Sequence, residues 1–197
     1  MEKIRRAEEA DRREVVECIL DAFQKDFAEF INKVGRDKVQ NFLEAGLRIH
    51  CFYVMELERE IIAVLALSNI RGRAMRQTKK AAQNSFGALF GGLLYMANFK
   101  DFDINYCTSK HTACIEFVAV RQDFRGRGLA SILIKRVISE TGYKSYILDV
   151  VDTNHAAIKC YSKLNFVETK REKVRFSKQR GFKEKIFMEY RRKDGER

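Results

Sequence analysis

The chain lacks proline, a long apolar run and any Cys-x-x-Cys pair. A membrane-spanning helix needs about 20 consecutive apolar residues, so we expect no membrane span. The five cysteines are scattered and are not grouped with the three histidines. We therefore expect no metal site, and we interpret the cysteines as buried free thiols. The first residues lack the apolar core of a signal peptide, which favours a cytoplasmic location.

Length and composition indicate one soluble globular domain. The chain has 197 residues, of which 46% are hydrophobic and 33% charged, enough to build a substantial core. Its formal net charge is +11, and about half of this excess lies in residues 168–197. A basic surface of this kind is typical of nucleic-acid binding but also of a solvated surface. We favour the solvated surface and do not expect nucleic acid as a partner.

A glycine-rich turn connects an apolar segment to an amphipathic one near the middle of the chain. Residues 115–120 are typical of a strand, and apolar residues spaced three and four apart from Leu129 onward indicate a helix. Unpaired N–H groups and the positive end of the helix dipole make such a junction a site for phosphate. The glycines let the backbone approach the ligand, and the arginines add charge. The candidate phosphate-binding residues are Arg125, Gly126, Arg127, Gly128, Leu129 and Ala130.

A second motif follows this turn. Residues 146–151 are typical of a strand, and Asn154 is placed to cap the helix that follows it. That helix carries Tyr161 and ends at the sequence Leu-Asn-Phe, residues 164–166. A helix stop of this kind requires the left-handed conformation, which asparagine tolerates better than most residues other than glycine.

In this order and spacing, the two motifs resemble the signatures of GNAT-type N-acetyltransferases. The family often has proline before its arginine, where this chain has Gln122, and glycine where this chain has Asn165. The resemblance implies an α/β fold with a mixed, mostly antiparallel sheet flanked by helices, as a single domain over residues 1–197. It also implies acetyl-CoA as cosubstrate and transfer of the acetyl group to a primary amine by direct attack on the thioester.

The resemblance further suggests roles for individual residues. Tyr161 matches the family tyrosine whose hydroxyl faces the CoA sulfur, so it is the candidate acid. The backbone of Val118, Ala119 and Val120 matches the segment that pairs with the pantetheine arm, and one of these amides could serve the oxyanion. Asn154 would either hydrogen-bond the same arm or act only as the helix cap.

The reaction also needs a base, because an alkylammonium acceptor is mostly protonated at pH 7. Glu116 is the candidate. It lies two residues before Val118, so we expect the two side chains to face the same side of the strand. Attraction of a cationic amine, without proton transfer, is the alternative role for Glu116. Asp149 on the following strand is the weaker candidate base.

The remaining elements follow from hydrophobic periodicity and turn residues. We expect a short first strand, a helix capped by Asp11 that extends to Phe23, a second helix, and two β-hairpins. The ranges expected for the strand, the second helix and the hairpins are 3–7, 36–45, 50–56 with 60–68, and 167–176 with 182–190.

A long insert, residues 70–110, separates the expected third and fourth strands. Its first half is basic and its second half is apolar with several glycines. A connection of this length usually has its own structure or function, and we expect a helix. It could serve as a lid over the acceptor site, a homodimer contact, a membrane-surface helix or an extra helix packed on the sheet.

Two other classes of function compete with the enzyme. One is a catalytically weak acyl-CoA-binding or nucleic-acid-contacting regulatory module on the same fold. The other is a structural interaction domain that uses the insert as its surface. No motif distinguishes a small amine, a peptide N-terminus, a lysine or an antibiotic as the acceptor.

Overall fold

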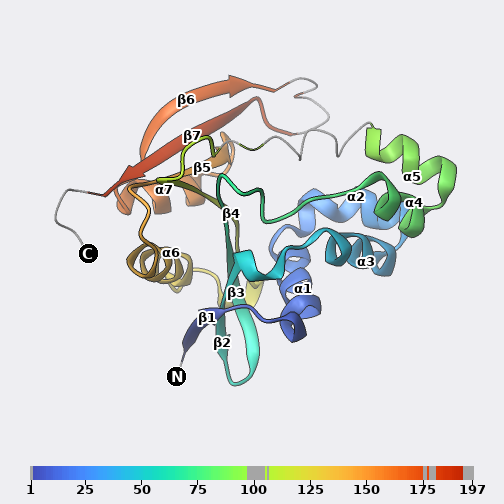
Figure 1. Ribbon diagram of the computed structural model, residues 1–197, viewed down its shortest axis with the longest axis horizontal. Coiled ribbons are helices and arrows are strands. Elements are labelled where there is room, and N and C mark those ends of the chain that lie inside the picture. Colours follow the sequence, from blue (N-terminus) through green and yellow to red (C-terminus); the bar gives the residue numbers. More distant parts are fainter. Residues whose placement is uncertain (1, 97–104, 106, 175–176, 178–180, 193–197) are drawn as a thin grey trace.

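One seven-stranded sheet forms the centre of the molecule (Figure 1). The computed structural model of the protein describes residues 2–96, 105, 107–174, 177 and 181–192. Along the sheet the strand order is β1-β2-β3-β4-β5-β7-β6. The strands are β1 (Lys3–Arg6), β2 (Phe52–Leu57), β3 (Glu60–Ser68), β4 (Thr112–Val120), β5 (Ser145–Val151), β6 (Val167–Lys173) and β7 (Glu184–Arg191). The α-helices are α1 (Arg12–Ala22), α2 (Gln24–Val34), α3 (Arg36–Gly46), α4 (Lys79–Phe86), α5 (Ala88–Leu94), α6 (Leu129–Glu140) and α7 (His155–Lys163).

The sheet is mixed and mostly antiparallel, as expected. Only β4 and β5 run parallel, and they pair over just three residues each, Thr112 to Cys114 with Ser145 to Ile147. The pairing ends at Cys114 in β4 and Ile147 in β5. The rest of the two strands is not paired with each other, so a gap opens between them toward the end of β4. This gap determines where a ligand could pair with the sheet.

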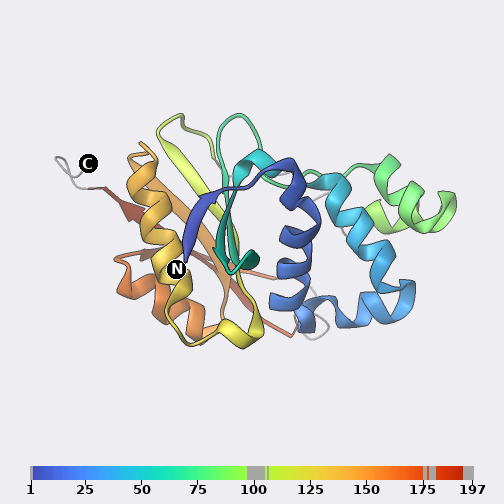
Figure 2. The same cartoon turned by 90° about the horizontal axis from the view of Figure 1, so that it is seen from below.

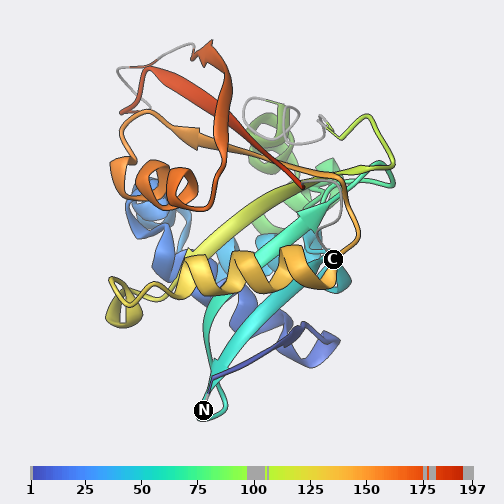
Figure 3. The same cartoon turned by 90° about the vertical axis from the view of Figure 1, so that its left-hand side faces the viewer.

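Helices cover both faces of the sheet (Figures 2 and 3). On one face, α1 and α3 bury apolar residues at helical spacing, such as Val15, Ile19 and Phe42, against the sheet. On the other face, α6 and α7 bury a second cluster that includes Leu133 and Tyr161. We call these the α1 face and the α6 face.

Most of the elements expected from the sequence are present. The hairpin of β2 and β3 turns at Glu58 and Arg59, which have φ values of 51° and 73°. The closing hairpin pairs β6 with β7, and β7 lies between β5 and β6. Helix α3 closes at Gly46, as expected, whereas helix α2 was not expected. Asp11 is the N-cap residue of α1, as expected, but its side chain makes no capping hydrogen bond, because its carboxylate binds Arg5 and the N–H of Glu8.

The insert forms two helices rather than one, separated at Gly87, which has a φ of 90°. Helix α4 packs on α2 and α3, with the Phe86 ring 5.3 Å from the ring of Phe30 and 5.1 Å from that of Phe42. Helix α5 packs on α4 at Gly91, where a Cβ would collide with the backbone of Ala82. Three apolar residues of α5 and one just beyond its end are exposed. They are Leu89, Phe90 and Leu93 in the helix and Met96 after it.

Part of the insert, residues 97–104 and 106, lies outside the described residues. In the described ranges, no helix is long and apolar enough to cross a bilayer. Nor do His, Cys, Asp and Glu side chains gather there in threes in a way that could hold a metal ion.

The expectation of free thiols is wrong for two of the five cysteines. Cys107 and Cys114 form a disulfide that ties the end of the insert to β4, whereas Cys18, Cys51 and Cys160 are free. The chain reverses just before β4, where Thr112 N–H donates to the carbonyl of Ser109, and this turn brings the two sulfurs together. Disulfides are rare in the cytosol, so this bond argues against the cytoplasmic location, which stays a prediction.

Candidate active site

The glycine-rich turn begins helix α6. Gly126 and Gly128 have φ values of 77° and 76°, which strain residues with a Cβ, and Gly128 is the N-cap. A Cβ at either position would meet nothing within 4 Å, so the backbone conformation, and not lack of space, requires glycine there. The space beside both residues is open. The first bond of the helix is accepted by the Gly128 carbonyl, which leaves the N–H groups of Leu129 and Ala130 without an acceptor in the helix. This junction has the form of an anion site.

The two arginines of the turn bind backbone carbonyls. Arg125 donates to the carbonyl of Ala22, at the end of α1, over 2.5 Å and to that of Val120 over 3.2 Å. Arg127 donates to the carbonyl of Asp123 over 3.0 Å. The guanidinium groups therefore hold the turn in place and add positive charge beside the exposed N–H groups.

The edge of β4 that faces the gap carries backbone groups suited to pair with an extended ligand. Arg121 N–H donates to Ile62 in β3, so by alternation the N–H groups of Val120 and Val118 face the gap. The N–H group of Ala119, which lies between them, faces β3. Of the three residues expected to hold the pantetheine arm, two therefore present their N–H groups to the gap.

A bulge in β4 overturns one expectation about Glu116. Phe117 has a φ of 50°, and the register with β3 shifts there, so β4 gains one residue. Glu116 pairs with Ala66, whose side chain belongs to the α1 face, whereas Val118 packs on the α6 face. The two side chains therefore lie on opposite faces, and the expectation of a shared face is wrong.

Glu116 is largely buried and bound at both carboxylate oxygens. Arg73 Nε donates to Glu116 Oε1 over 2.8 Å. The Glu116 side chain is 10% exposed and the Arg73 side chain is 15% exposed. Ser68 Oγ donates to the other oxygen and itself accepts from the N–H of Ala74 over 2.7 Å. Sequence reasoning missed Ser68 and Arg73; the basic start of the insert was the available signal. Glu116 thus anchors the first residues of the insert to β4.

Asp149 lies on β5, across the gap from β4. Its neighbours Leu148 and Val150 are buried in the α6 face, so by alternation Asp149 points to the α1 face, as Glu116 does. Asp149 forms an ion pair with Lys185 at 3.0 Å, and both side chains are about one third exposed. The two candidate bases therefore share a face, one on each side of the gap.

Tyr161 lies on α7, in the cluster against which Val118 and Val120 pack. It is 8% exposed, and its ring centroid is 6.0 Å from that of Phe166. Burial raises the pKa of its hydroxyl, so it stays protonated at neutral pH. Among the described residues we find no hydrogen-bond partner for this hydroxyl.

The helix that carries Tyr161 begins and ends as its sequence indicates. Asn154 caps α7, with its side-chain oxygen accepting from the N–H of Ala157 over 3.1 Å. Asn165 follows the helix with a φ of 64°, which confirms the expected left-handed stop.

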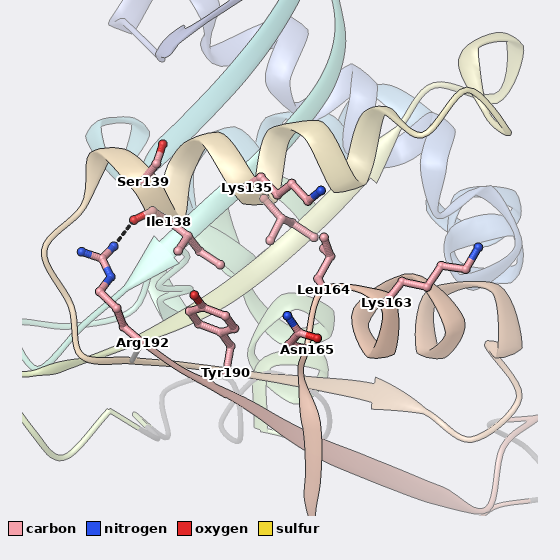
Figure 4. A pocket seen from close by; sticks show the side chains of 9 residues that line it. Lys135, Ile138, Ser139, Lys163, Leu164, Asn165, Tyr190 and Arg192 are labelled. Carbon is pink, nitrogen blue, oxygen red and sulfur yellow. Dashed lines mark hydrogen bonds between the residues drawn. The ribbon is translucent and has the colours of Figure 1, made fainter. Parts of the chain in front are cut away.

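A cavity of about 350 Å³ lies nearby, between α6, the end of α7 and β7 (Figure 4). Lys135 and Lys163 line it, and Arg192 reaches from its rim to the carbonyl of Ile138. None of the residues of the glycine turn or of the β4 edge lines this cavity. We therefore place the candidate cofactor site at the gap and the turn, not in this cavity.

Comparison with known proteins agrees with this geometry. Residues 16–166 match the model of the acetyltransferase (GNAT) family. The chain belongs to the GNAT family. This membership supports acyltransferase activity with acetyl-CoA as the acyl donor. No curated protein sequence matches the chain.

Solved structures of acetyltransferases share the fold at low sequence identity. An N-acetyltransferase from Staphylococcus aureus Mu50 is 16% identical, with a TM-score of 0.66 over 95% of this chain and 100% of its own. The ribosomal-protein-S18-alanine N-acetyltransferase from Escherichia coli is 17% identical, with a TM-score of 0.58 over 99% and 98%. YncA, a putative acetyltransferase from Salmonella typhimurium solved with its cofactor acetyl-CoA, is 18% identical, with a TM-score of 0.57 over 98% and 95%. At these identities the likeness shows the fold alone.

Proposed function

We propose that this GNAT protein is an N-acetyltransferase that moves the acetyl group of acetyl-CoA to a primary amine. One observation carries the proposal: the gap between β4 and β5 is continuous with the glycine turn. The unpaired edge of β4 leads directly to the glycine turn and to the open N-terminus of α6. A ligand with a peptide-like arm and a pyrophosphate fits this sequence of groups.

Residues of the chain hold each part of that ligand in this proposal. The N–H groups at Gly126 to Ala130 face the pyrophosphate, since no side chain fills the space beside the glycines. The gap-facing N–H groups of Val118 and Val120 bind the pantetheine arm. The amide nitrogen of Asn154 is available for the same arm, because the cap uses only its oxygen. When bound, acetyl-CoA supplies the thioester that the amine attacks.

Proton transfer is divided between the two faces of the sheet. Tyr161, on the α6 face, holds a proton that the leaving sulfur needs. The base must act on the acceptor amine, which approaches from the other side of the thioester. Glu116 and Asp149 both point to the α1 face, so either lies on the side opposite Tyr161. Glu116 could accept a proton only by loosening its bonds to Ser68 or Arg73.

An amine screen with mass detection tests this function. The protein is incubated with acetyl-CoA and a panel of polyamines, peptides with a free N-terminus, lysine peptides and aminoglycosides. We expect at least one acceptor to gain a single acetyl group at a rate that depends on the protein. Tight CoA binding without transfer to any amine would instead favour the regulatory acyl-CoA-binding module.

A further inference from the structure

A second cleft lies at the end of α6 away from the glycine turn. Its volume is about 330 Å³, and it is formed by the ends of β1 and β3, residues 48–53 and the residues that follow α6. Three arginines and a histidine, from three segments far apart in the sequence, line it: Arg6, Arg48, Arg71 and His50. No residue of the candidate cofactor site belongs to this cleft.

The positive charge in this cleft is not balanced. Within the described part of the chain, none of its arginines forms an ion pair with a carboxylate, and no acidic residue lines the cleft. Two carboxylates interact with lining residues, Glu116 with Cys51 and Glu140 with Tyr53, and both are paired elsewhere. Glu116 binds Arg73, and Glu140 binds Arg136 at 2.6 Å.

Neutral groups hold the guanidinium groups of Arg6 and Arg48 in position. Arg48 donates to the carbonyl of Arg73 over 3.2 Å, and Arg6 lies over the Tyr53 ring, 5.1 Å from its centroid. Arg71 is carried by the turn between Asn69 and Gly72, whose backbones bond to each other. Neutral contacts therefore position the guanidinium groups of Arg6 and Arg48 without neutralising them, and the turn places Arg71 beside them, so their charge is available to a ligand.

The surroundings suit an organic anion. The buried ring of Tyr53 and the side chain of Leu67 give the cleft an apolar floor beneath its cationic rim. The carbonyl end of α6 would repel an anion, but Arg192 donates to the carbonyls of Ile138 and Thr141 there. The helix end is therefore compensated.

We propose that this arginine cleft binds a small organic anion with at least two acidic groups, either carboxylates or phosphates, on a compact body. Guanidinium groups match the oxygens of both acids with paired hydrogen bonds. A volume of about 330 Å³ is in the range of small-molecule sites and encloses a ligand more closely than a nucleic-acid surface would. The site is separate from the acetyl-transfer site and does not depend on that function.

Calorimetric titration with citrate and with pyrophosphate tests the proposal, since one probe carries carboxylates and the other phosphates. Pyrophosphate also fits the glycine turn, so the expected result is one saturable site per chain, for at least one probe, that Gly128→Asp retains. The probe that binds this retained site more tightly identifies the acid. The double variant Arg6→Ala, Arg71→Ala should weaken this binding at least about tenfold. Both residues are exposed, and the single variant Arg71→Glu serves as a second test if the double variant fails to fold.

Matched controls distinguish binding in the cleft from binding elsewhere on the basic surface. The double variant Arg36→Ala, Arg76→Ala removes the same charge from exposed positions outside the cleft and should bind the probe as the unaltered protein does. Gly128→Asp should also leave this binding intact, because it alters only the glycine turn. No saturable binding, equal losses in both double variants, or loss only in Gly128→Asp would overturn the proposal. So would an RNA oligonucleotide that binds through Arg6 and Arg71 more tightly than either probe.

Discussion

The two faces of the sheet are built in different ways. On the α6 face, the candidate cofactor site comes from one continuous stretch, residues 118–161, and most of its groups are backbone N–H groups. On the α1 face, the side chains that meet come from distant positions, as in the pair of Arg73 with Glu116. Binding to the backbone depends on local conformation, whereas side-chain chemistry depends on which segments pack together. A fold can therefore keep one cofactor while its acceptor side changes.

The strongest test of this difference is a change in backbone conformation at the glycine turn. Gly128→Asp adds a side chain at a φ of 76° and a negative charge beside the proposed pyrophosphate. We expect CoA affinity, measured by calorimetry, to fall by about 100-fold, or about 2.7 kcal/mol. Gly142→Asp, at the other end of α6 and also in open space, is the control and should bind CoA normally. Unaltered CoA affinity in folded Gly128→Asp would remove the turn from the site.

Tyr161→Phe removes one hydroxyl from the α6 face and keeps the ring. We expect kcat to fall by about 100-fold while CoA affinity stays the same, because proton donation affects the reaction and not binding. Tyr143→Phe, which alters a tyrosine in the arginine cleft, is the control. An unchanged kcat would return Tyr161 to a role in packing.

The same substitution has a consequence for stability at high pH. Burial raises the pKa of Tyr161 above its unfolded value near 10, so the folded state favours the protonated phenol. This contribution is fully present below the unfolded pKa and is lost as pH rises through the folded pKa. Denaturation followed above pH 10 should therefore show a steeper loss of stability in the original protein than in Tyr161→Phe. Equal slopes would contradict the effect of burial.

Amide variants can distinguish the roles of the two carboxylates on the α1 face, Glu116 and Asp149. If Asp149 is the base, Asp149→Asn should lower kcat by about 100-fold and shift the pH–rate profile. Glu116→Gln should then act mainly on stability and acceptor KM, because it weakens the bond to Arg73. The opposite pattern would identify Glu116 as the base. Normal kcat and KM in both variants would show that neither carboxylate takes part.

Loss of the disulfide should lower the stability of the fold, with little effect on CoA affinity. Closing a loop of this length stabilises a fold by roughly 2–3 kcal/mol in the chain-entropy description. Reduction, or the pair Cys107→Ser and Cys114→Ser, should lower the free energy of unfolding by that amount. CoA affinity should stay near normal, with Cys160→Ser as the control. An unchanged free energy of unfolding, or free thiols at both positions in the purified protein, would show that the bond does not form.

The smallest effect is expected at α5. Its residues Leu89, Phe90 and Leu93 are 49–86% exposed, so they contribute little buried surface to the described fold. Replacing Phe90 and Leu93 with serine should leave stability and CoA affinity unaltered and change only acceptor KM or oligomeric state. Light scattering and acceptor kinetics check this. If CoA affinity falls in the folded variant, the insert belongs to the cofactor site.

Local sequence was sufficient where neighbouring residues determine structure. Gly128 and Asn165 take the left-handed conformations that their positions required, and Asn154 caps its helix. The hairpins were predictable for the same reason, since turn residues and hydrophobic periodicity act over short distances. The mixed sheet was expected from the resemblance of the two motifs to the GNAT family. The sequence by itself therefore determined the fold class and the form of the phosphate-binding turn.

Tertiary structure decided what depends on distant contacts. The bulge at Phe117 turned Glu116 to the opposite face, and neither the Arg73 pair nor the disulfide follows from spacing. The arginine cleft likewise joins residues 6, 48 and 71, which no short motif connects. The physical reason is that one extra residue in a strand reverses every side chain beyond it, and that charges and thiols meet only after the segments between them have packed.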